Sequence, residues 1–266
     1  MNVSIIIPVY MPNKEILKKV LNSIKKQKFY WKIEVIKVEK GLGLAASLNY
    51  GIKKAKHEIV VSLHQDCVPS ETEWLKKLLE PLKDKDIIAS VSKVHLPEEL
   101  WGKLSIFARS LTLKERGAIV PLLDEKGCAY KKSVLKEVGF FNEKDFRTAG
   151  EDFDLYLRIK NKGKIAYPNC EVLHFHATSL KARLNKNYQN ANGYGALVGI
   201  HGREMNRWWA GVLKATPIVG FFFTLTSYPF NKSWALFPFY IITSIPDHFL
   251  YICGFWKGFL MKRQTV

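Results

Sequence analysis

The sequence has few acidic residues and no paired cysteines. It contains 24 Asp and Glu against 41 Lys and Arg, which gives a formal net charge of +17. Such a charge attracts phosphates in nucleic acid, lipid headgroups or a nucleotide, and charge alone does not choose among them. The four cysteines, Cys67, Cys128, Cys170 and Cys253, form no CxxC pair and match no zinc spacing. We therefore expect free thiols in a reducing compartment.

The N-terminus also lacks the pattern of a signal peptide. Its apolar run from Val3 to Val9 is short, contains Pro8 and has no basic leader. We therefore expect the first part of the protein to stay in the cytoplasm. Hydrophobic residues make up 47% of the 266 residues, which allows a packed core and excludes global disorder.

Residues 1 to about 180 alternate between strand and helix patterns. The run VSIIIPVY and residues 59–63 are continuous apolar segments, typical of strands buried on both faces. IEVIKVEK is a second strand, with Ile33, Val35 and Val38 as inward candidates. The intervening segment NKEILKKVLNSIKKQ has apolar residues at helical spacing and lysines on the other face.

This β-α-β-α-β order predicts an α/β fold with a mostly parallel sheet and right-handed crossovers. Ligands of such sheets bind outside the carboxyl ends of the strands. Those ends carry Pro8, Val9, Tyr10, Glu39, His64, Gln65 and Asp66.

The composition shifts after about residue 205. Residues 212–230 and 234–256 are nearly free of charge, and each approaches the ~20 apolar residues that cross a bilayer. Their prolines favour broken or tilted helices. Basic residues flank the pair on both sides, which favours a membrane hairpin with both ends in the cytoplasm. A buried helical pair, or a re-entrant hairpin lying in the membrane plane, is the alternative.

Asp66 directly follows a predicted buried strand in the segment SLHQDCVPS. A carboxylate at that sheet edge can bind a divalent cation, because such hard cations prefer oxygen ligands. A turn or cap role is equally consistent with Asp66 taken alone.

Two acidic residues, Glu151 and Asp152, follow Gly150 and open a predicted helix. A carboxylate there can take the proton of an acceptor hydroxyl. Acids are also favoured in a first helical turn by the helix dipole, so capping is the alternative. In the segment VLHFHATS, His174 and His176 alternate along a predicted strand and should share one face. Imidazole is a good ligand for manganese-type metals.

In this order, the four segments resemble the family 2 glycosyltransferases of the GT-A fold over residues 1 to about 185. The opening SIIIPVYMPNKEILKKVLNSIKKQ is followed by GLGLAASLNYGIKKAKHEIVVSLHQDCVPS, which is similar to the helix and aspartate metal motif of the family. GCAYKKSVLKEVGFFNEKDFRTAGEDFDLYLRIKNKG resembles the acceptor-side segment, and VLHFHATSLKARL resembles the histidine segment of rhamnosyltransferase-like members.

The resemblance implies direct displacement with inversion at the anomeric carbon, and a divalent metal, Mn2+ or Mg2+. Asp66 and His174 would bind the metal, Asp152 would be the general base, and Glu151 would contact the acceptor. The resemblance assigns Pro8, Val9, Tyr10, Glu39, Asn49, Gln65 and Asp66 to the nucleotide-sugar, and Gly127, Cys128, Glu151 and His176 to the acceptor.

Two features depart from the family pattern. The acidic loop that usually follows the second strand is missing, and Glu39 is its one stand-in before Lys40-Gly41. The motif His64-Gln65-Asp66 offers one carboxylate where many members have two.

From these features we predict a catalytic domain over residues 1–205 and a membrane-associated helical region over residues 206–266. We expect an enzyme at the cytoplasmic side of the cell membrane that glycosylates a lipid-linked or other membrane-held acceptor and does not bind nucleic acid. A polyprenyl-phosphate sugar synthase is an alternative, with Lys181, Arg183 and Lys186 holding the lipid phosphate. A non-catalytic basic module is a third, but its lysines are spread over helix exteriors.

Overall fold

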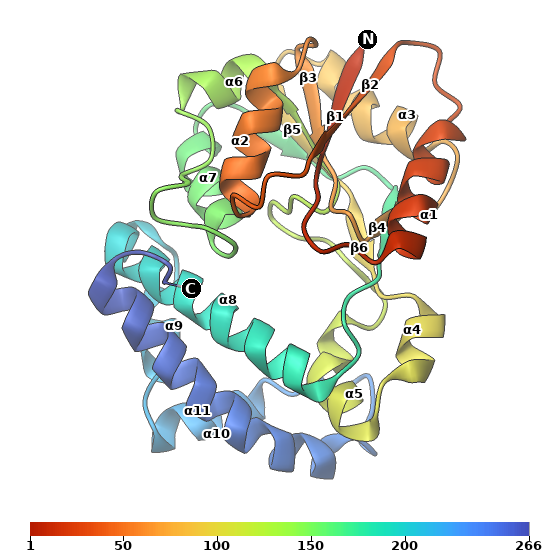
Figure 1. The fold of residues 1–266 in the computed structure, drawn as a ribbon. Coiled ribbons are helices and arrows are strands. Elements are labelled where there is room, and N and C mark those ends of the chain that lie inside the picture. The colour runs from red at the N-terminus through yellow and green to blue at the C-terminus, as the bar shows by residue number, and fades with distance from the viewer. Residues whose placement is uncertain (266) are drawn as a thin grey trace. The chain divides into compact units, whose positions relative to one another are not determined.

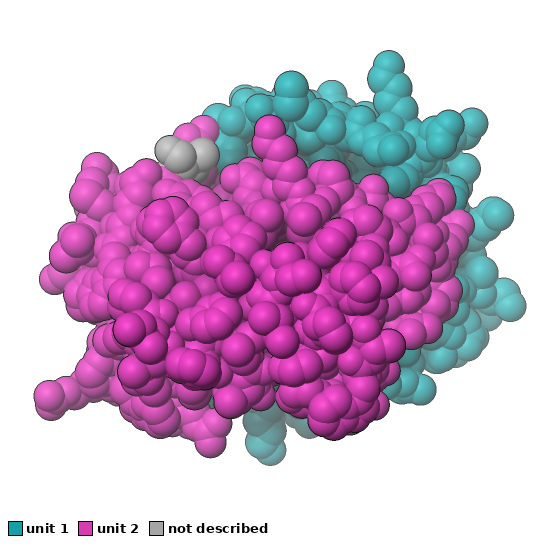
Figure 2. Space-filling model, turned by 90° about the horizontal axis from the view of Figure 1, so that it is seen from below, with its two compact units in different colours: residues 1–97, 117–143, 152–176 teal, residues 98–116, 144–151, 177–266 magenta. Residues whose placement is uncertain are grey.

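The chain divides into two compact units in a computed structural model that describes residues 1–265 (Figures 1 and 2). Unit 1 consists of Met1–Pro97, Gly117–Glu143 and Asp152–His176. Unit 2 consists of Glu98–Arg116, Lys144–Glu151 and Ala177–Val266. This division into compact units differs from the predicted boundary after residue 205. Composition indicated the apolar C-terminal helices. The two earlier segments of unit 2, Glu98–Arg116 and Lys144–Glu151, have ordinary composition and gave no signal.

A mixed sheet of six strands forms the centre of unit 1, in the order β2-β1-β3-β8-β5-β9. The strands are β1 (Val3–Pro8), β2 (Ile33–Val38), β3 (Ile59–Ser62), β5 (Ile87–Val91), β8 (Cys128–Lys131) and β9 (Lys164–Ala166). The pairs β1–β2, β1–β3 and β5–β9 are parallel, whereas β8 runs antiparallel to both β3 and β5. The sheet is thus less parallel than predicted. The chain enters β8 from a loop, and without a helical crossover a parallel direction is not imposed.

A second, smaller sheet in unit 1 has the order β4-β10-β6-β7. It consists of β4 (Cys67–Pro69), β6 (Lys93–His95), β7 (Ala118–Ile119) and β10 (Glu171–His174). β10 lies in the segment predicted as a strand, whereas β4 and β7, with three and two residues, are too short to be predicted from periodicity. This sheet matters for the site because β4 and β10 pair antiparallel, with His174 opposite Cys67.

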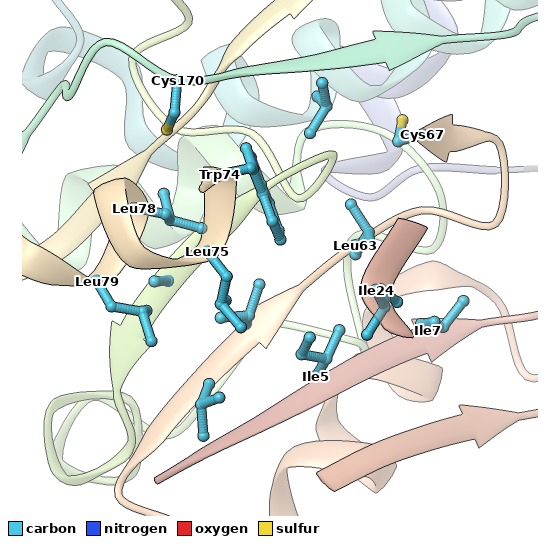
Figure 3. Close-up of a cluster of buried hydrophobic side chains, with 14 of the residues drawn as sticks. Ile5, Ile7, Ile24, Leu63, Cys67, Trp74, Leu75, Leu78, Leu79 and Cys170 are labelled. Carbon is cyan, nitrogen blue, oxygen red and sulfur yellow. The ribbon is translucent and has the colours of Figure 1, made fainter. Parts of the chain in front are cut away.

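Two hydrophobic clusters cover the two faces of the large sheet. Along β1, Val3, Ile5 and Ile7 belong to one cluster and Ile6 to the other, as the alternation of a strand requires. The first cluster takes in side chains of α1 and α3, and its residues are drawn in Figure 3. The second takes in side chains of α2, α6 and α7. The helices of this unit are α1 (Lys14–Lys25), α2 (Leu44–Lys54), α3 (Trp74–Leu79) with the 3-10 turn η1 (Glu80–Lys83), α6 (Lys132–Glu137) and α7 (Glu151–Ile159).

Two local predictions for unit 1 have opposite outcomes. The start of α1 is confirmed, because the Asn13 side chain accepts hydrogen bonds from the backbone N–H groups of Glu15 and Ile16. The inward placement of Val35 is wrong, since Val35 is 41% exposed while Val38 is buried. β2 is an edge strand of the sheet, so part of its apolar face stays in water.

Unit 2 is entirely helical in the residues described. Its helices are α4 (Glu98–Lys103), α5 (Ile106–Thr112), η2 (Leu113–Glu115), α8 (Leu180–His201), η3 (Gly202–Glu204), α9 (Trp208–Lys214), α10 (Ile218–Thr226) and α11 (Phe237–Met261). The long helices α8 and α11 lie side by side (Figure 1). Glycines permit their close approach: a Cβ at Gly258 would collide with the backbone oxygen of Asn192, and one at Gly195 with that of Phe255.

The predicted hairpin of two membrane spans is not confirmed. Within residues 1–265, no single helix is both long and apolar enough to cross a bilayer. The first predicted span is broken into α9 and α10, which are bent by 114°. By length and composition this bent pair could be a broken span or a re-entrant loop. The break at residues 215–217 includes Pro217, and a proline disfavours helix in the residue before it.

Candidate active site

Asp66 and His174 lie beside each other in unit 1, although they are far apart in the sequence. Asp66 lies in the turn between β3 and β4, and His174 ends β10. The antiparallel pairing of β4 and β10, extended by a hydrogen bond from the Phe175 N–H to the Asp66 carbonyl (2.8 Å), brings them together. The distance from His174 Nε2 to Asp66 Oδ2 is 3.6 Å. The expected convergence of these two residues is therefore observed.

Asp66 is held in its ionised form. Burial alone would raise its pKa, but the neighbouring imidazoles, His174 above all, outweigh burial and lower the pKa of Asp66 well below its usual range. Burial lowers the pKa of His64 to about 4, so this imidazole is neutral at physiological pH. A neutral imidazole can donate a lone pair to a metal.

His64, Asp66 and Cys67 form a group whose ligand atoms all lie within 4.8 Å of one another. Among the described residues, no hydrogen-bond partner reaches the buried Nε2 of His64, as expected for a nitrogen that is available to a cation. Carboxylate oxygens suit both Mg2+ and Mn2+, whereas an imidazole donor favours a transition metal such as Mn2+ over Mg2+. Cys67 fits less well: it belongs to the hydrophobic cluster of Figure 3, and burial raises the pKa of its thiol. The site thus fits a divalent metal through Asp66 and His64, with His174 adjacent.

A partly buried ion pair next to this group was missed in the sequence analysis. Lys126 Nζ lies 2.9 and 2.7 Å from the two carboxylate oxygens of Asp124, in the loop that precedes β8. Lys126 and the carboxylate of Asp124 both act electrostatically on His64 and on Asp152. The available signal was the run Asp124-Glu125-Lys126. It stands directly before Gly127 and a buried strand, where charged residues are unusual.

Asp152 has a raised pKa. Burial, followed by the neighbouring Asp124 carboxylate, raises the pKa of Asp152 to about 6. The Phe153 N–H, which donates to Asp152 Oδ1 at 2.7 Å, and the charge of Lys126 act in the opposite direction. A carboxylate with a pKa near neutrality suits a general base. Glu151 opens α7 as predicted but is 3% exposed and belongs to unit 2, so it is not presented to an acceptor from solvent.

Tyr10 is the exposed member of the predicted nucleotide-binding group after β1. Its ring is 66% exposed and lies beside Gly41, whereas Val9 is buried in the core and Pro8 ends β1. Gln65 holds this segment in place through two hydrogen bonds with the Tyr10 backbone, of 2.8 and 2.9 Å. Gln65 therefore links the loop after β1 to the segment that carries Asp66.

Two further residues of the predicted nucleotide site, Asn49 and Glu39, bind other residues of the protein. Asn49 is buried in α2, where its amide accepts from the Phe141 N–H and donates to the Phe141 carbonyl and to Glu143. It fastens a loop and is not available to a nucleotide, which corrects the prediction. Glu39 is exposed and pairs with Lys37 at 3.0 Å.

The predicted acceptor contacts differ in placement. Cys128 is 0% exposed and packs in the second hydrophobic cluster, so it cannot touch an acceptor, which corrects the prediction. Gly127 packs against Ser92 and Val172, where a Cβ would be crowded. His176 lies beyond the end of β10, and its ring centroid is 5.4 Å from that of His174, so the two rings lie on the same side as expected.

The basic tract considered for a lipid phosphate is partly occupied within unit 2. Arg183 is buried and forms an ion pair with Glu115. The guanidinium charge is therefore compensated inside the unit, which weakens the case for a phosphate site on this tract.

Comparison with known proteins gives one sequence-family match. Residues 27–139 match the family model described as glycosyl transferase family 2. A search of curated protein sequences finds no match.

The fold has counterparts among solved structures. The mannosyltransferase PcManGT from Pyrobaculum calidifontis, solved in complex with GDP-Man and Mn2+, is 14% identical with a TM-score of 0.57, and the match covers 93% of this chain and 86% of that one. GalNAc-T7, solved with UDP, GalNAc and Mn2+, is also 14% identical with a TM-score of 0.56. That match covers 93% of this chain and 58% of GalNAc-T7, so the chain spans little more than half of its length. The family match and the shared fold together support a glycosyltransferase of the GT-A type.

Proposed function

We propose that this chain transfers a sugar from a nucleotide-sugar to an acceptor hydroxyl, with inversion at the anomeric carbon. The observation that carries the proposal is the placement of Asp66 and His174 at 3.6 Å beside the neutral His64, whose Nε2 is buried, in the same unit as Asp152. PcManGT was solved with GDP-Man and Mn2+, and GalNAc-T7 with UDP, GalNAc and Mn2+. Both structures support this choice of donor and metal.

Asp66 and His64 would hold the divalent metal, and His174 would orient the Asp66 carboxylate or join the ligand set. The metal, when bound, neutralises the diphosphate of the donor and so makes it a better leaving group. Asp152 takes the proton of the acceptor hydroxyl while the new bond to the anomeric carbon forms and the bond from that carbon to the phosphate oxygen breaks. The electron pair of the broken bond remains on the released diphosphate.

We further propose that the acceptor is held at a membrane and that the enzyme works at the cytoplasmic face. Support comes from exposed apolar side chains on two helices of unit 2. On α10, Phe222 is 62% exposed, and on α11, Ile245 and Phe249 are 59% and 65% exposed. Large exposed apolar side chains on neighbouring helices are typical of surfaces that bind a membrane or a partner.

The histidines His174 and His176 support a place among the rhamnosyltransferase-like members of the family. A screen of nucleotide-sugars with Mn2+ would identify the donor sugar, since the nucleotide-sugar that binds raises the melting temperature of the protein.

Asp66→Ala tests the function. We expect nucleotide-sugar turnover with Mn2+, and the stabilisation by Mn2+ with nucleoside diphosphate, to be lost in this variant. Asp86→Ala is the matched control, because Asp86 is 72% exposed and pairs only loosely with Lys164 at 3.9 Å. Equal turnover in Asp66→Ala and the wild type would overturn the proposal.

A further inference from the structure

The ion pair of Asp124 and Lys126 has no role in the function proposed so far. Its loop is firmly placed in unit 1. Asp124 also accepts a hydrogen bond from the Lys126 N–H at 3.0 Å, and Leu123 is buried in the second hydrophobic cluster. The next residue, Gly127, accepts a hydrogen bond from the Ser92 N–H at 2.9 Å. The ammonium group therefore extends from a fixed backbone.

The pair is costly for a purely structural feature. The Asp124 and Lys126 side chains are 14% and 26% exposed. The free energy needed to remove two charges from water offsets most of the free energy gained by their attraction. Apolar residues of similar size often stabilise a protein as well or better. The stability of the fold alone therefore does not explain a partly buried pair in this position.

The surroundings of Lys126 point to a ligand that carries negative charge. Its positive charge acts on His64 and Cys67, at the end of β3 and the start of β4, and on Asp152 at the start of α7. The strand pairing agrees with this: Ser62 of β3 lies opposite Cys128 of β8, so the loop that carries Lys126 runs beside the end of β3, which leads to His64 and Asp66. The diphosphate of the donor must occupy this region if the proposed function holds.

We propose that Lys126, oriented by Asp124, is a fixed cation that binds the diphosphate of the donor and stabilises the leaving nucleoside diphosphate. The inference rests on the proposed function. A nucleotide-sugar carries about two negative charges on its diphosphate, and the released nucleoside diphosphate about three, so one charge develops as the bond breaks. A divalent metal balances the first two, and the Lys126 ammonium balances the charge that develops.

Asp124 serves Lys126 in two ways. Burial alone would lower the pKa of Lys126, but the Asp124 carboxylate outweighs it and raises that pKa, so the ammonium stays charged. The two hydrogen bonds to Asp124 use two of the three N–H donors of an ammonium group and leave the third for a phosphate oxygen. Asp124 is in this sense a positioning residue.

The test uses Lys126→Gln and Lys126→Arg in the full chain, with pyrophosphate plus Mn2+ as the probe in isothermal titration calorimetry. Loss of a charge-assisted hydrogen bond predicts about 10-fold weaker binding for Lys126→Gln, with partial recovery in Lys126→Arg. The kcat should fall more than the KM rises, because the developing charge is present only in the transition state. Lys83→Gln is the control, since Lys83 is a 53% exposed lysine paired with Glu80 at 2.8 Å.

A second variant keeps the test decisive if Lys126→Gln does not fold. The double variant Asp124→Asn with Lys126→Met removes both charges at once and leaves no uncompensated buried carboxylate. We expect it to fold and to show the same weakened binding of Mn2+–pyrophosphate. Binding equal to wild type in a folded Lys126 variant overturns the role of Lys126 alone. Absence of Mn2+–pyrophosphate binding in the wild-type protein overturns the proposed function and this inference together.

Discussion

The two units of this chain treat charge and apolar surface in opposite ways. Unit 1 gathers partly buried charged groups, Asp66, Asp124, Lys126 and Asp152, which act electrostatically on one another or on the neighbouring His64. Unit 2 leaves large apolar side chains in contact with solvent, such as Ile218 at 74% and Phe249 at 65% exposure. Both arrangements are costly to an isolated soluble fold, and both become favourable when a ligand or a surface supplies what is missing. Unit 1 is suited to a charged substrate, and unit 2 to an apolar environment.

The strongest test of this comparison is the proposed general base of unit 1, Asp152, where we expect the largest effect. Asp152→Asn keeps the size of the side chain but removes its capacity to take a proton, so we expect kcat to fall by about 100- to 10,000-fold. The measurement is steady-state release of nucleoside diphosphate from the donor. Glu137→Gln is the control, because Glu137 is an exposed carboxylate paired with Lys162 at 2.7 Å. Unchanged kcat in Asp152→Asn would remove Asp152 from the chemistry.

The next effect tests the apolar surface of unit 2. Replacing both Phe222 and Phe249 by Ser should weaken binding to vesicles that contain anionic lipid by at least about 100-fold, since two buried aromatic rings together contribute about 3–6 kcal/mol. Flotation of the full chain with the vesicles measures this. Tyr30→Ser is the control, because Tyr30 is 95% exposed in unit 1. If the wild-type protein does not float with vesicles but forms dimers that the double variant lacks, this surface binds a second copy and the membrane proposal fails.

A smaller effect follows from the raised pKa of Asp152. The group acts as a base only when ionised, so kcat/KM should be full above pH about 6 and fall by about 10-fold per pH unit below it. Burial disfavours the charged form of this carboxyl group, so the pKa is raised and activity is lost as the pH falls below it. Asp124→Asn removes a carboxylate that raises the pKa of Asp152, so the fall should begin at a lower pH in this variant. A shift in the other direction would contradict this arrangement of charges.

Sequence reasoning reached further in unit 1 than in unit 2, for physical reasons. Continuous β-branched runs such as that of β1, and the cap at Asn13, are local signals, and the elements formed where expected. The resemblance to the family placed Asp66 and His174 at one metal site, and the antiparallel pairing of β4 and β10 brings them together. Cys128 and Asn49 were misassigned because a family motif gives residue types but not which way a side chain faces. In unit 2, hydropathy located the apolar residues and the prolines indicated a break, but the size of the bend, 114°, depends on tertiary packing that no local window reports.

The smallest effect concerns how unit 2 holds itself together. Gly258→Ala places a methyl group against the backbone oxygen of Asn192, where neither helix can move without losing the close contact of α8 and α11. We expect the free energy of unfolding to fall by about 1–3 kcal/mol, measured by urea denaturation. Gly102→Ala is the matched control, because Gly102 lies in α4 of the same unit and a Cβ there meets nothing within 4 Å. Since alanine favours helix over glycine, this control should be unchanged or more stable by up to about 1 kcal/mol. Equal effects of the two substitutions would mean that the two long helices are not closely packed, and that unit 2 depends on its apolar surroundings and not on its own core.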